Sequence, residues 1–336
     1  MTIATKIRSK LHRKWKYASN DLRGMFGLNK QMFHHAQGAR IIIYHGICRN
    51  DHTRFNSIFL TLKTFEAHLQ FYKKYFHIIS LDDYYQQRFS KERFNICITF
   101  DDGFANNYKY VLPLMNKYQV PLTFFITAIR DAEYDILWND FFAIAQKYGP
   151  QQFQFNNEKF YKDRDGRYVS KATGKILKDL LQADDFNKKA AMMKVLEPMV
   201  SFKNKLQDKD YWLQMTQEEI KILSTSPLAN VGCHGYYHND LSAISITEAR
   251  NEIFRSKQWL ETITGKEINA IAFPYGAYSR DVVREAKSAG FNQLLGMDFL
   301  FPEDDADPTL RERFTVNPYI TVNNQMIAII KGKYEL

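Results

Sequence analysis

The sequence lacks three features that would assign it to a class at once. No stretch approaches 18 consecutive apolar residues, so no transmembrane helix is expected. The N-terminus has no continuous apolar core of the kind a secretory signal needs, because Lys and Arg are scattered through residues 1–16. Cysteine is scarce: Cys48, Cys97 and Cys233 are odd in number and far apart, which predicts reduced thiols rather than a disulfide framework. We therefore expect a cytoplasmic protein.

Acidic residues are almost absent from the first 40 positions. This segment has nine Lys or Arg and a single acid, Asp21, and so carries +8 of the chain's net +9. Apolar side chains recur at the spacing of one helix face, at Ile3, Ile7, Leu11 and Trp15. The pattern predicts a basic amphipathic arm over residues 1–40. Residues 1–30 either bind an anionic membrane surface, the inner face in a cytoplasmic protein, or cover the rest of the fold. No nucleic-acid partner is expected, because the charge belongs to this arm.

From residue 41 onwards, short apolar strands alternate with helices. This order predicts an α/β fold with a parallel sheet. The alternation is interrupted between about residues 130 and 210, which are polar with aromatic clusters. We interpret this segment as a helical insertion with a hairpin turn at Asp165-Gly166. The expected domains are the arm and one α/β domain over residues 41–325 that carries the insertion.

Local signals mark several helix ends. Thr216 with Glu219, and Ser245 with Glu248, have the spacing of capping boxes. Thr64 is the expected N-cap of a helix that begins at residue 65. These signals predict where three helices of the alternating pattern begin.

Polar residues directly follow several of the expected strands. The residues in this position are His45, Asp101, Asp102, His234 and Pro274. Because the carboxyl ends of parallel strands meet at one edge, where functional sites gather, these side chains are expected to lie together. His238 follows His234 by four positions. The strand ends therefore predict one shared site.

One Asp and two His can bind a divalent cation and leave coordination positions for water. Three protein ligands with open positions are typical of hydrolytic rather than structural metal sites. The second carboxylate is then a natural base for that water. Taken alone, Asp-Asp-Gly is also common in turns, and the two histidines could be solvated loop residues. Their coincidence at strand ends favours a functional site.

Three motifs in this sequence resemble those of the polysaccharide deacetylases, carbohydrate esterase family four with its NodB-homology domain. They are Thr-Phe-Asp-Asp-Gly at 99–103, His-Gly-Tyr-Tyr-His at 234–238 and Phe-Pro-Tyr-Gly at 273–276. The similarity covers roughly residues 41–130 and 210–320, in order. It implies a distorted (β/α)7 barrel and metal-dependent removal of an acyl group, usually acetyl, from an amino sugar.

The resemblance also implies residue roles. By position, Asp101 is the implied general base, and the implied metal ligands are Asp102, His234 and His238. The backbone N–H of Tyr275 is the implied donor to the oxyanion. Zinc is the first expectation, and the family also tolerates cobalt, nickel or manganese. No organic cofactor is implied.

The sequence departs from the family pattern in two places. The third motif usually begins with an Arg that braces the catalytic Asp, but Ala272 and Phe273 occupy that region here, as in a recognisable subgroup. The late histidine that serves as general acid has no counterpart, because every histidine lies at or before His238. His45 is the candidate for that acid, and an ordinary packing role for it stays open. Asp298 is a loose match to the late Asp that tunes the acid.

The expected function is metal-dependent N-deacetylation of a sugar in surface-glycan synthesis. The carbohydrate substrate could be a polymer, a nucleotide-linked sugar or a lipid-linked sugar. One alternative is an amidase that acts on a small non-sugar amide. Another is a catalytically silent barrel that binds a glycan or docks on a membrane. The complete Asp-Asp-His-His set argues against silence, and the missing late histidine argues for it.

Overall fold

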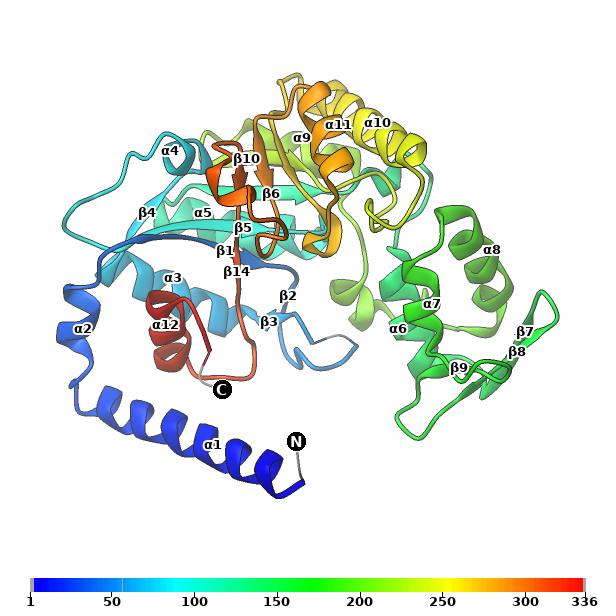
Figure 1. Cartoon of the computed structure of the whole chain (residues 1–336), viewed down its shortest axis with the longest axis horizontal. Coiled ribbons are helices and arrows are strands. Elements are labelled where there is room, and N and C mark those ends of the chain that lie inside the picture. Colours follow the sequence, from blue (N-terminus) through cyan, green and yellow to red (C-terminus); the bar gives the residue numbers. More distant parts are fainter. Residues whose placement is uncertain (1–2, 56, 335–336) are drawn as a thin grey trace.

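The computed structural model describes residues 3–55 and 57–334 (Figure 1). The side chains of Ile3 and Ile7, two members of the predicted apolar stripe, lie outside this description. The centre is one curled sheet in which every strand pair is parallel, with the order β13-β12-β11-β10-β6-β5-β1-β14. These strands are β1 (Ala39–Tyr44), β5 (Asn95–Phe100), β6 (Leu122–Ile126), β10 (Ala229–Cys233), β11 (Ala270–Ala272), β12 (Gln293–Leu295), β13 (Leu310–Arg311) and β14 (Phe314–Thr315). A ninth strand, β4 (His77–Ile79), pairs with the first half of β5.

Helices connect these strands and cover the outside of the sheet (Figure 1). They are α3 (Leu62–Tyr75), α4 (Leu81–Tyr85), α5 (Leu112–Tyr118), α9 (Gln217–Thr225), α10 (Ile246–Thr264), α11 (Arg280–Ser288) and α12 (Val322–Lys331), with a π-helical turn η1 (Asn107–Val111) leading into α5. The short strands β2 (Ile47–Cys48) and β3 (Leu60–Thr61) form a separate pair. This arrangement confirms the predicted α/β fold, a distorted barrel.

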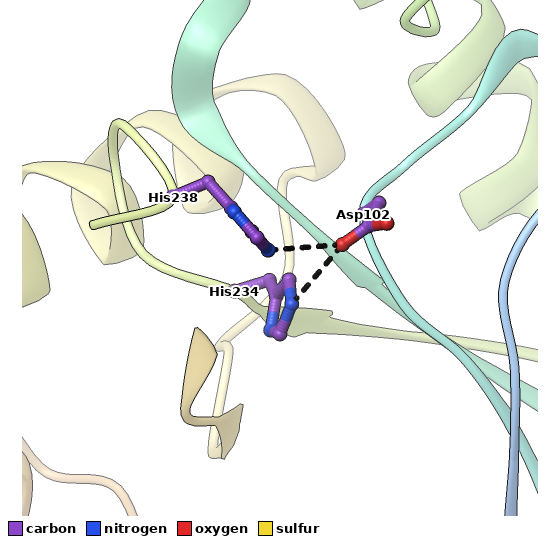
Figure 2. Close-up of side chains that lie close together, drawn as sticks. All are labelled: Asp102, His234 and His238. Carbon is purple, nitrogen blue, oxygen red and sulfur yellow. Dashed lines mark ion pairs between the residues drawn. The ribbon is translucent and has the colours of Figure 1, made fainter. Parts of the chain in front are cut away.

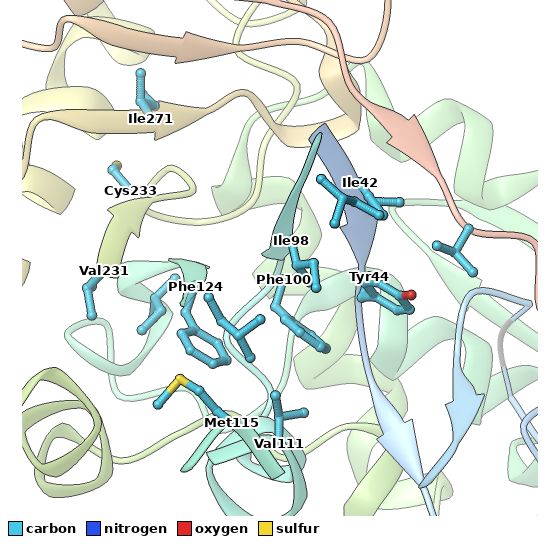
Figure 3. Packing of buried hydrophobic residues seen from close by; sticks show 14 of the residues in the cluster. Ile42, Tyr44, Ile98, Phe100, Val111, Met115, Phe124, Val231, Cys233 and Ile271 are labelled. Atoms are coloured by element: carbon cyan, nitrogen blue, oxygen red, sulfur yellow. The ribbon is translucent and has the colours of Figure 1, made fainter. Parts of the chain in front are cut away.

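The sheet has apolar side chains on both faces, because successive residues of a strand point to opposite sides. The larger core lies between the sheet and its helices, where Ile98 and Phe100 of β5 pack with Ile42 and Tyr44 of β1 (Figure 3). The alternate positions Ile41 and Cys97 belong to a smaller cluster together with Phe125 and Leu295. All three cysteines are buried and free, as expected for reduced thiols.

The insertion forms a second body beside the barrel (Figure 1). Its helices are α6 (Trp138–Tyr148), α7 (Leu177–Gln182) and α8 (Phe186–Leu196), with 3₁₀ turns η2 (Ala128–Arg130), η3 (Glu197–Met199) and η4 (Leu206–Tyr211). It also holds an antiparallel sheet of β7 (Gln152–Phe155), β8 (Glu158–Lys162) and β9 (Tyr168–Ser170). The predicted hairpin joins β8 to β9, and Gly166 has the left-handed φ of +78° that such a turn favours. The insertion has its own core, which includes Trp138 and Trp212.

The N-terminal arm is helical and leads into the barrel. It consists of α1 (Ile3–Met25) and the short α2 (Lys30–His34), and α1 packs on α12 near the C-terminus (Figure 1). No helix in residues 3–55 and 57–334 combines the length and apolar character that a membrane crossing requires. The arm contacts the barrel through α1, which packs on α12, and through Phe33 of α2, whose ring packs against that of Phe71 in α3.

Candidate metal centre and active site

Strand β5 presents two adjacent carboxylates at the edge of the sheet. Asp101 continues the alternation of Cys97 and Thr99, and its N–H donates to the carbonyl of Tyr44 (3.0 Å), which ties it to the end of β1. Asp102 already has a left-handed φ of +76°. The chain turns sharply there, and a Cβ at the next residue, Gly103, would lie 2.8 Å from the side chain of Ile126. Both carboxylates are buried.

Strand β10 ends in the loop that carries both histidines. The N–H of His234 donates to the carbonyl of Ile126 (3.0 Å), so this histidine extends the pairing with β6. Glu252 of α10 holds the following turn, since its Oε2 accepts from the N–H groups of Tyr236 (3.2 Å) and Tyr237 (3.0 Å). His238 has a left-handed φ of +57°, which is unusual for a residue other than glycine.

Asp102, His234 and His238 converge as the sequence predicts (Figure 2). Asp102 Oδ1 lies 3.3 Å from His234 Nε2 and 3.1 Å from His238 Nε2, and the three ligand atoms all lie within 4.8 Å of one another. The carbonyl of Ala272 accepts a hydrogen bond from His234 Nδ1 (2.7 Å), which leaves the lone pair on Nε2, the atom that faces the carboxylate. This donor set fits a divalent metal with free coordination positions.

Arg313 is a site residue that the sequence analysis missed. It lies between β13 and β14, and its NH1 and NH2 each donate to one oxygen of Asp101 at 2.8 Å. The same guanidinium donates to Thr99 Oγ1 (3.3 Å) and to the carbonyl of Gly296 (3.1 Å). Both partners of the ion pair are almost fully buried. Arg313 thus does what an Arg at the start of the third motif would do, and no spacing signal connects it to that motif.

The charges of the site set the protonation of the two carboxylates. Burial raises the pKa of Asp101, but the charges of Arg313 and His234 outweigh burial, and the pKa lies below its ordinary value. Burial also raises the pKa of Asp102, and His238 and His234 then lower it well below the ordinary value. Both side chains are therefore ionised at neutral pH, as the predicted roles of Asp101 as a base and Asp102 as a ligand require.

His45 lies at the same mouth, at the end of β1. Burial lowers its pKa, while the charges of Asp102 and Asp101 raise it, and the net shift is downwards. Its carbonyl accepts a hydrogen bond from Asn107 Nδ2 (3.0 Å), which fixes the backbone there. The imidazole is thus within electrostatic reach of both carboxylates and half-buried. The role of His45 as the general acid stays a prediction.

A tight turn, η5 (Pro274–Gly276), brings Tyr275 against His238, one of the predicted metal ligands. Its φ is +61°, and its ring packs edge-on against that of His238, with ring centroids 4.8 Å apart. Burial and the charges of Asp102 and Asp140 raise the pKa of the phenol well above its ordinary value, so it stays protonated. The oxyanion role of the Tyr275 N–H stays a prediction.

The insertion contacts the histidine loop directly. Trp138 Nε1 donates to the carbonyl of His238 (3.0 Å). Lys189 Nζ of α8 donates to Asn239 Oδ1 (2.5 Å), and Asn239 Nδ2 donates to Glu252 Oε1 (2.6 Å). The sequence suggested that the insertion's aromatic residues form its own core; Trp138 does so and also holds the backbone of a predicted metal ligand.

Asp298 lies in the segment that follows β12. Its side chain is exposed, and its backbone carbonyl accepts a hydrogen bond from the hydroxyl of Tyr278 (3.3 Å). The match to a late Asp that tunes the acid therefore stays a prediction. The carboxylates near His45 are instead Asp101 and Asp102.

Comparison with known proteins agrees with this geometry. A family model described as polysaccharide deacetylase matches residues 90–160 and 198–294, which together make half of the chain. These segments hold Asp101, the three predicted ligands and Tyr275, but neither His45 nor Arg313. No curated protein matches the chain.

Several solved structures share the fold. The deacetylase PplD of Streptococcus pyogenes, solved with acetate, has a TM-score of 0.56 at 13% identity, over 88% of this chain and 99% of that one. A polysaccharide deacetylase from Bacillus cereus has a TM-score of 0.54 at 18% identity, over 88% of this chain and 69% of that one. IcaB from Ammonifex degensii has a TM-score of 0.51 at 15% identity, over 88% and 97%. At these identities the likeness shows the fold.

Proposed function

Since the chain belongs to the polysaccharide deacetylase family, we propose that it is a metal-dependent hydrolase that removes an acetyl group from an N-acetylated sugar. The observation that carries the proposal is the buried set of Asp102, His234 and His238 with the ion-paired Asp101 beside it. The second ionised carboxylate, that of Asp101, lies 4.0 Å from His234 Nε2. Burying two carboxylates at one site costs stability, so this arrangement supports a functional role over a purely structural one. We propose zinc as the metal; cobalt, nickel and manganese suit the same nitrogen and oxygen ligands.

The bound metal would polarise the acetyl carbonyl and lower the pKa of water at the site. Asp101, ionised and held by Arg313, accepts a proton from the attacking water. The water oxygen bonds to the acetyl carbon while the N–H of Tyr275 donates to the developing oxyanion. His45 then relays the proton that Asp101 accepted to the sugar nitrogen as the C–N bond breaks. The products are acetate and a free amino sugar.

The unusual third motif fits this scheme. Phe273 stands where the family usually has an Arg, and Arg313 reaches the base from the end of β13 instead. We propose that the chain belongs with the members whose third motif begins with Phe, in which the brace of the base comes from another strand. We also propose that the sugar is a precursor of a surface glycan and that the reaction takes place in the cytoplasm.

Acetate release tests the proposal directly. The metal-loaded protein would be incubated with N-acetylated oligosaccharides, a nucleotide-linked N-acetyl sugar, a polyprenyl-linked N-acetyl sugar and a small non-sugar amide, with Asp101→Asn as the matched control. We expect equal amounts of acetate and free amine from at least one sugar, and almost none from the variant. Turnover of the non-sugar amide alone would favour an amidase, and no turnover of any substrate would favour a silent barrel.

A further inference from the structure

The N-terminal helix α1 docks on the protein through its polar face. Asn20 Nδ2 donates to Asn324 Oδ1 (3.1 Å), and Asp21 Oδ1 accepts from Thr321 Oγ1 (2.6 Å). A Cβ on Gly24 would lie 2.8 Å from Asn323 Oδ1, so the two helices approach closely at this position. These contacts fix which side of α1 faces α12.

The apolar face of α1 consequently points away from the protein. Leu11, Trp15, Leu22 and Met25 fall within roughly 80° of one another around the helix, and Asn20 lies about 180° from Leu11. Their exposed fractions are 62%, 67%, 56% and 83%. An ordinary amphipathic helix buries this face. The sequence-based alternative, in which the stripe covers the barrel, is therefore wrong for its described members, Leu11 and Trp15.

The exposed stripe continues beyond the helix. Phe26 and Leu28 are exposed by 73% and 63%, so the apolar surface extends through the turn between α1 and α2. In Figure 1, α1 runs along the outer edge of the molecule with α12 on its inner side. A partner could reach the length of the stripe without moving another element.

The arm that carries this stripe is basic, and its described residues include a single acid, Asp21. The exposed cations of the arm are Arg8, Lys10, Arg13, Lys14, Arg23 and Lys30. The carboxylate of Asp21, the arm's single acid, accepts hydrogen bonds from Thr321 Oγ1 and from Asn324 Nδ2, the second at 2.8 Å. Exposed apolar side chains flanked by uncompensated cations are the pattern of a helix that lies in the interface of an anionic bilayer.

We propose that α1 and the following turn bind the surface of an anionic lipid bilayer, with Leu11, Trp15, Leu22 and Met25 inserted among the acyl chains. A second copy of the chain is the less suitable occupant, because pairing two such faces would bring two segments of +8 together. The helix lies on the bilayer and does not cross it. In a cytoplasmic protein this surface is the inner membrane face. The proposal does not depend on the deacetylase activity.

Tryptophan fluorescence is a specific reporter of this binding. Trp15 is 67% exposed, whereas Trp138, Trp212 and Trp259 are 0%, 2% and 7% exposed. The full chain would be mixed with vesicles of phosphatidylcholine alone and with vesicles that also contain phosphatidylglycerol, and followed by emission and co-sedimentation. We expect a blue shift and co-sedimentation with the anionic vesicles only, both weakened by added salt.

One variant disrupts the apolar stripe, and another removes cations of the arm. Leu22→Asp/Met25→Asp keeps the reporter and the contacts to α12, and should weaken vesicle binding by about 100-fold or more. The matched control, Leu206→Asp, replaces a leucine that is 70% exposed in the insertion and should bind like the unchanged chain. Arg8→Gln/Lys14→Gln should lower the preference for anionic over neutral vesicles. Unchanged melting temperatures show that the variants remain folded.

Two results would overturn the proposal. The first is an unchanged emission spectrum and no co-sedimentation of the full chain with anionic vesicles at low salt. The second is vesicle binding by Leu22→Asp/Met25→Asp that equals that of the unchanged chain. The full chain could instead form a dimer in solution, fail to bind vesicles, and become monomeric when this double change is made. That outcome would show that the apolar face binds a second copy of the chain.

Discussion

The ion pair between Arg313 and Asp101 can be tested by removing its cation. Arg313→Gln keeps a polar but shorter side chain, and it takes away the charge and the two 2.8 Å contacts to the carboxylate. Asp101 would then be a buried anion that has lost its guanidinium partner and keeps the more distant His234, whose Nε2 lies 4.0 Å from its Oδ2. Breaking a buried pair on one side typically costs about 3–5 kcal/mol, because the remaining charge is left uncompensated. We expect the free energy of unfolding to fall by about that amount.

The same change should shift the pH dependence. The pKa of Asp101 in the folded protein lies below its ordinary value, which is the value in the unfolded chain. The ion pair therefore stabilises the fold fully at pH values above the ordinary pKa. This contribution is lost as the pH falls through the lower, folded pKa. Without Arg313 the effect of burial remains, and the pKa of Asp101 should rise. The acid limb of both the stability and the rate profile should therefore move to higher pH.

The assay is urea unfolding of metal-free protein, treated with chelator, for a double-mutant cycle. Asp101→Asn/Arg313→Gln removes both charges and should be more stable than Arg313→Gln alone. Arg311→Gln is the matched control, because Arg311 lies two residues earlier and donates to the backbone carbonyls of Asp307 and Leu310 instead. A loss below about 1 kcal/mol in Arg313→Gln, with no coupling in the cycle, would refute the reasoning.

Four further predictions concern the remaining site residues. Asp102→Asn should abolish metal retention and turnover together, and full metal occupancy by elemental analysis would contradict its role as a ligand. Asp101→Asn should keep the metal and lose turnover by roughly 100-fold or more, and near-normal rates would exclude it as the base. His45→Ala should spare metal binding and flatten the alkaline limb of the pH–rate profile, whereas an unchanged limb would assign the acid elsewhere. Trp138→Phe should weaken metal binding in a chelator competition by roughly 10-fold. The matched control is Trp212→Phe, which should leave metal binding unchanged, because the buried Nε1 of Trp212 has no hydrogen-bond partner among the described residues.

Local sequence signals predicted much of the fold. Both capping boxes are present, Thr216 with Glu219 and Ser245 with Glu248, because the partners are three residues apart and need no tertiary contact. One helix start was wrong: α3 begins at Leu62, and Thr61 is its N-cap, accepting from the N–H of Thr64. Thr61 and Thr64 are both suitable N-cap residues. The pairing of β3 with β2 ends at Thr61, so the helix begins three residues earlier than the sequence indicates.

The site was predictable as far as it depends on strand ends. The two carboxylates and two histidines follow β5 and β10, and the parallel sheet then brings them together. Arg313 was not predictable, because its contact to Asp101 joins positions 212 residues apart and no motif marks it. The hydrogen bond from Trp138 to His238 likewise depends on how a separate body packs on the barrel. The outward apolar face of α1 follows from polar contacts to α12 that periodicity cannot reveal.

Metal reconstitution tests the central claim most directly. Metal-free protein would be titrated with zinc while bound metal and acetate release from an N-acetylated oligosaccharide are measured on the same sample. We predict no acetate before metal is added, and a rate that rises with bound zinc until one equivalent is reached at Asp102, His234 and His238. Acetate release at full rate without metal, or zinc bound at one equivalent with no acetate released from any N-acetylated sugar, would contradict the account.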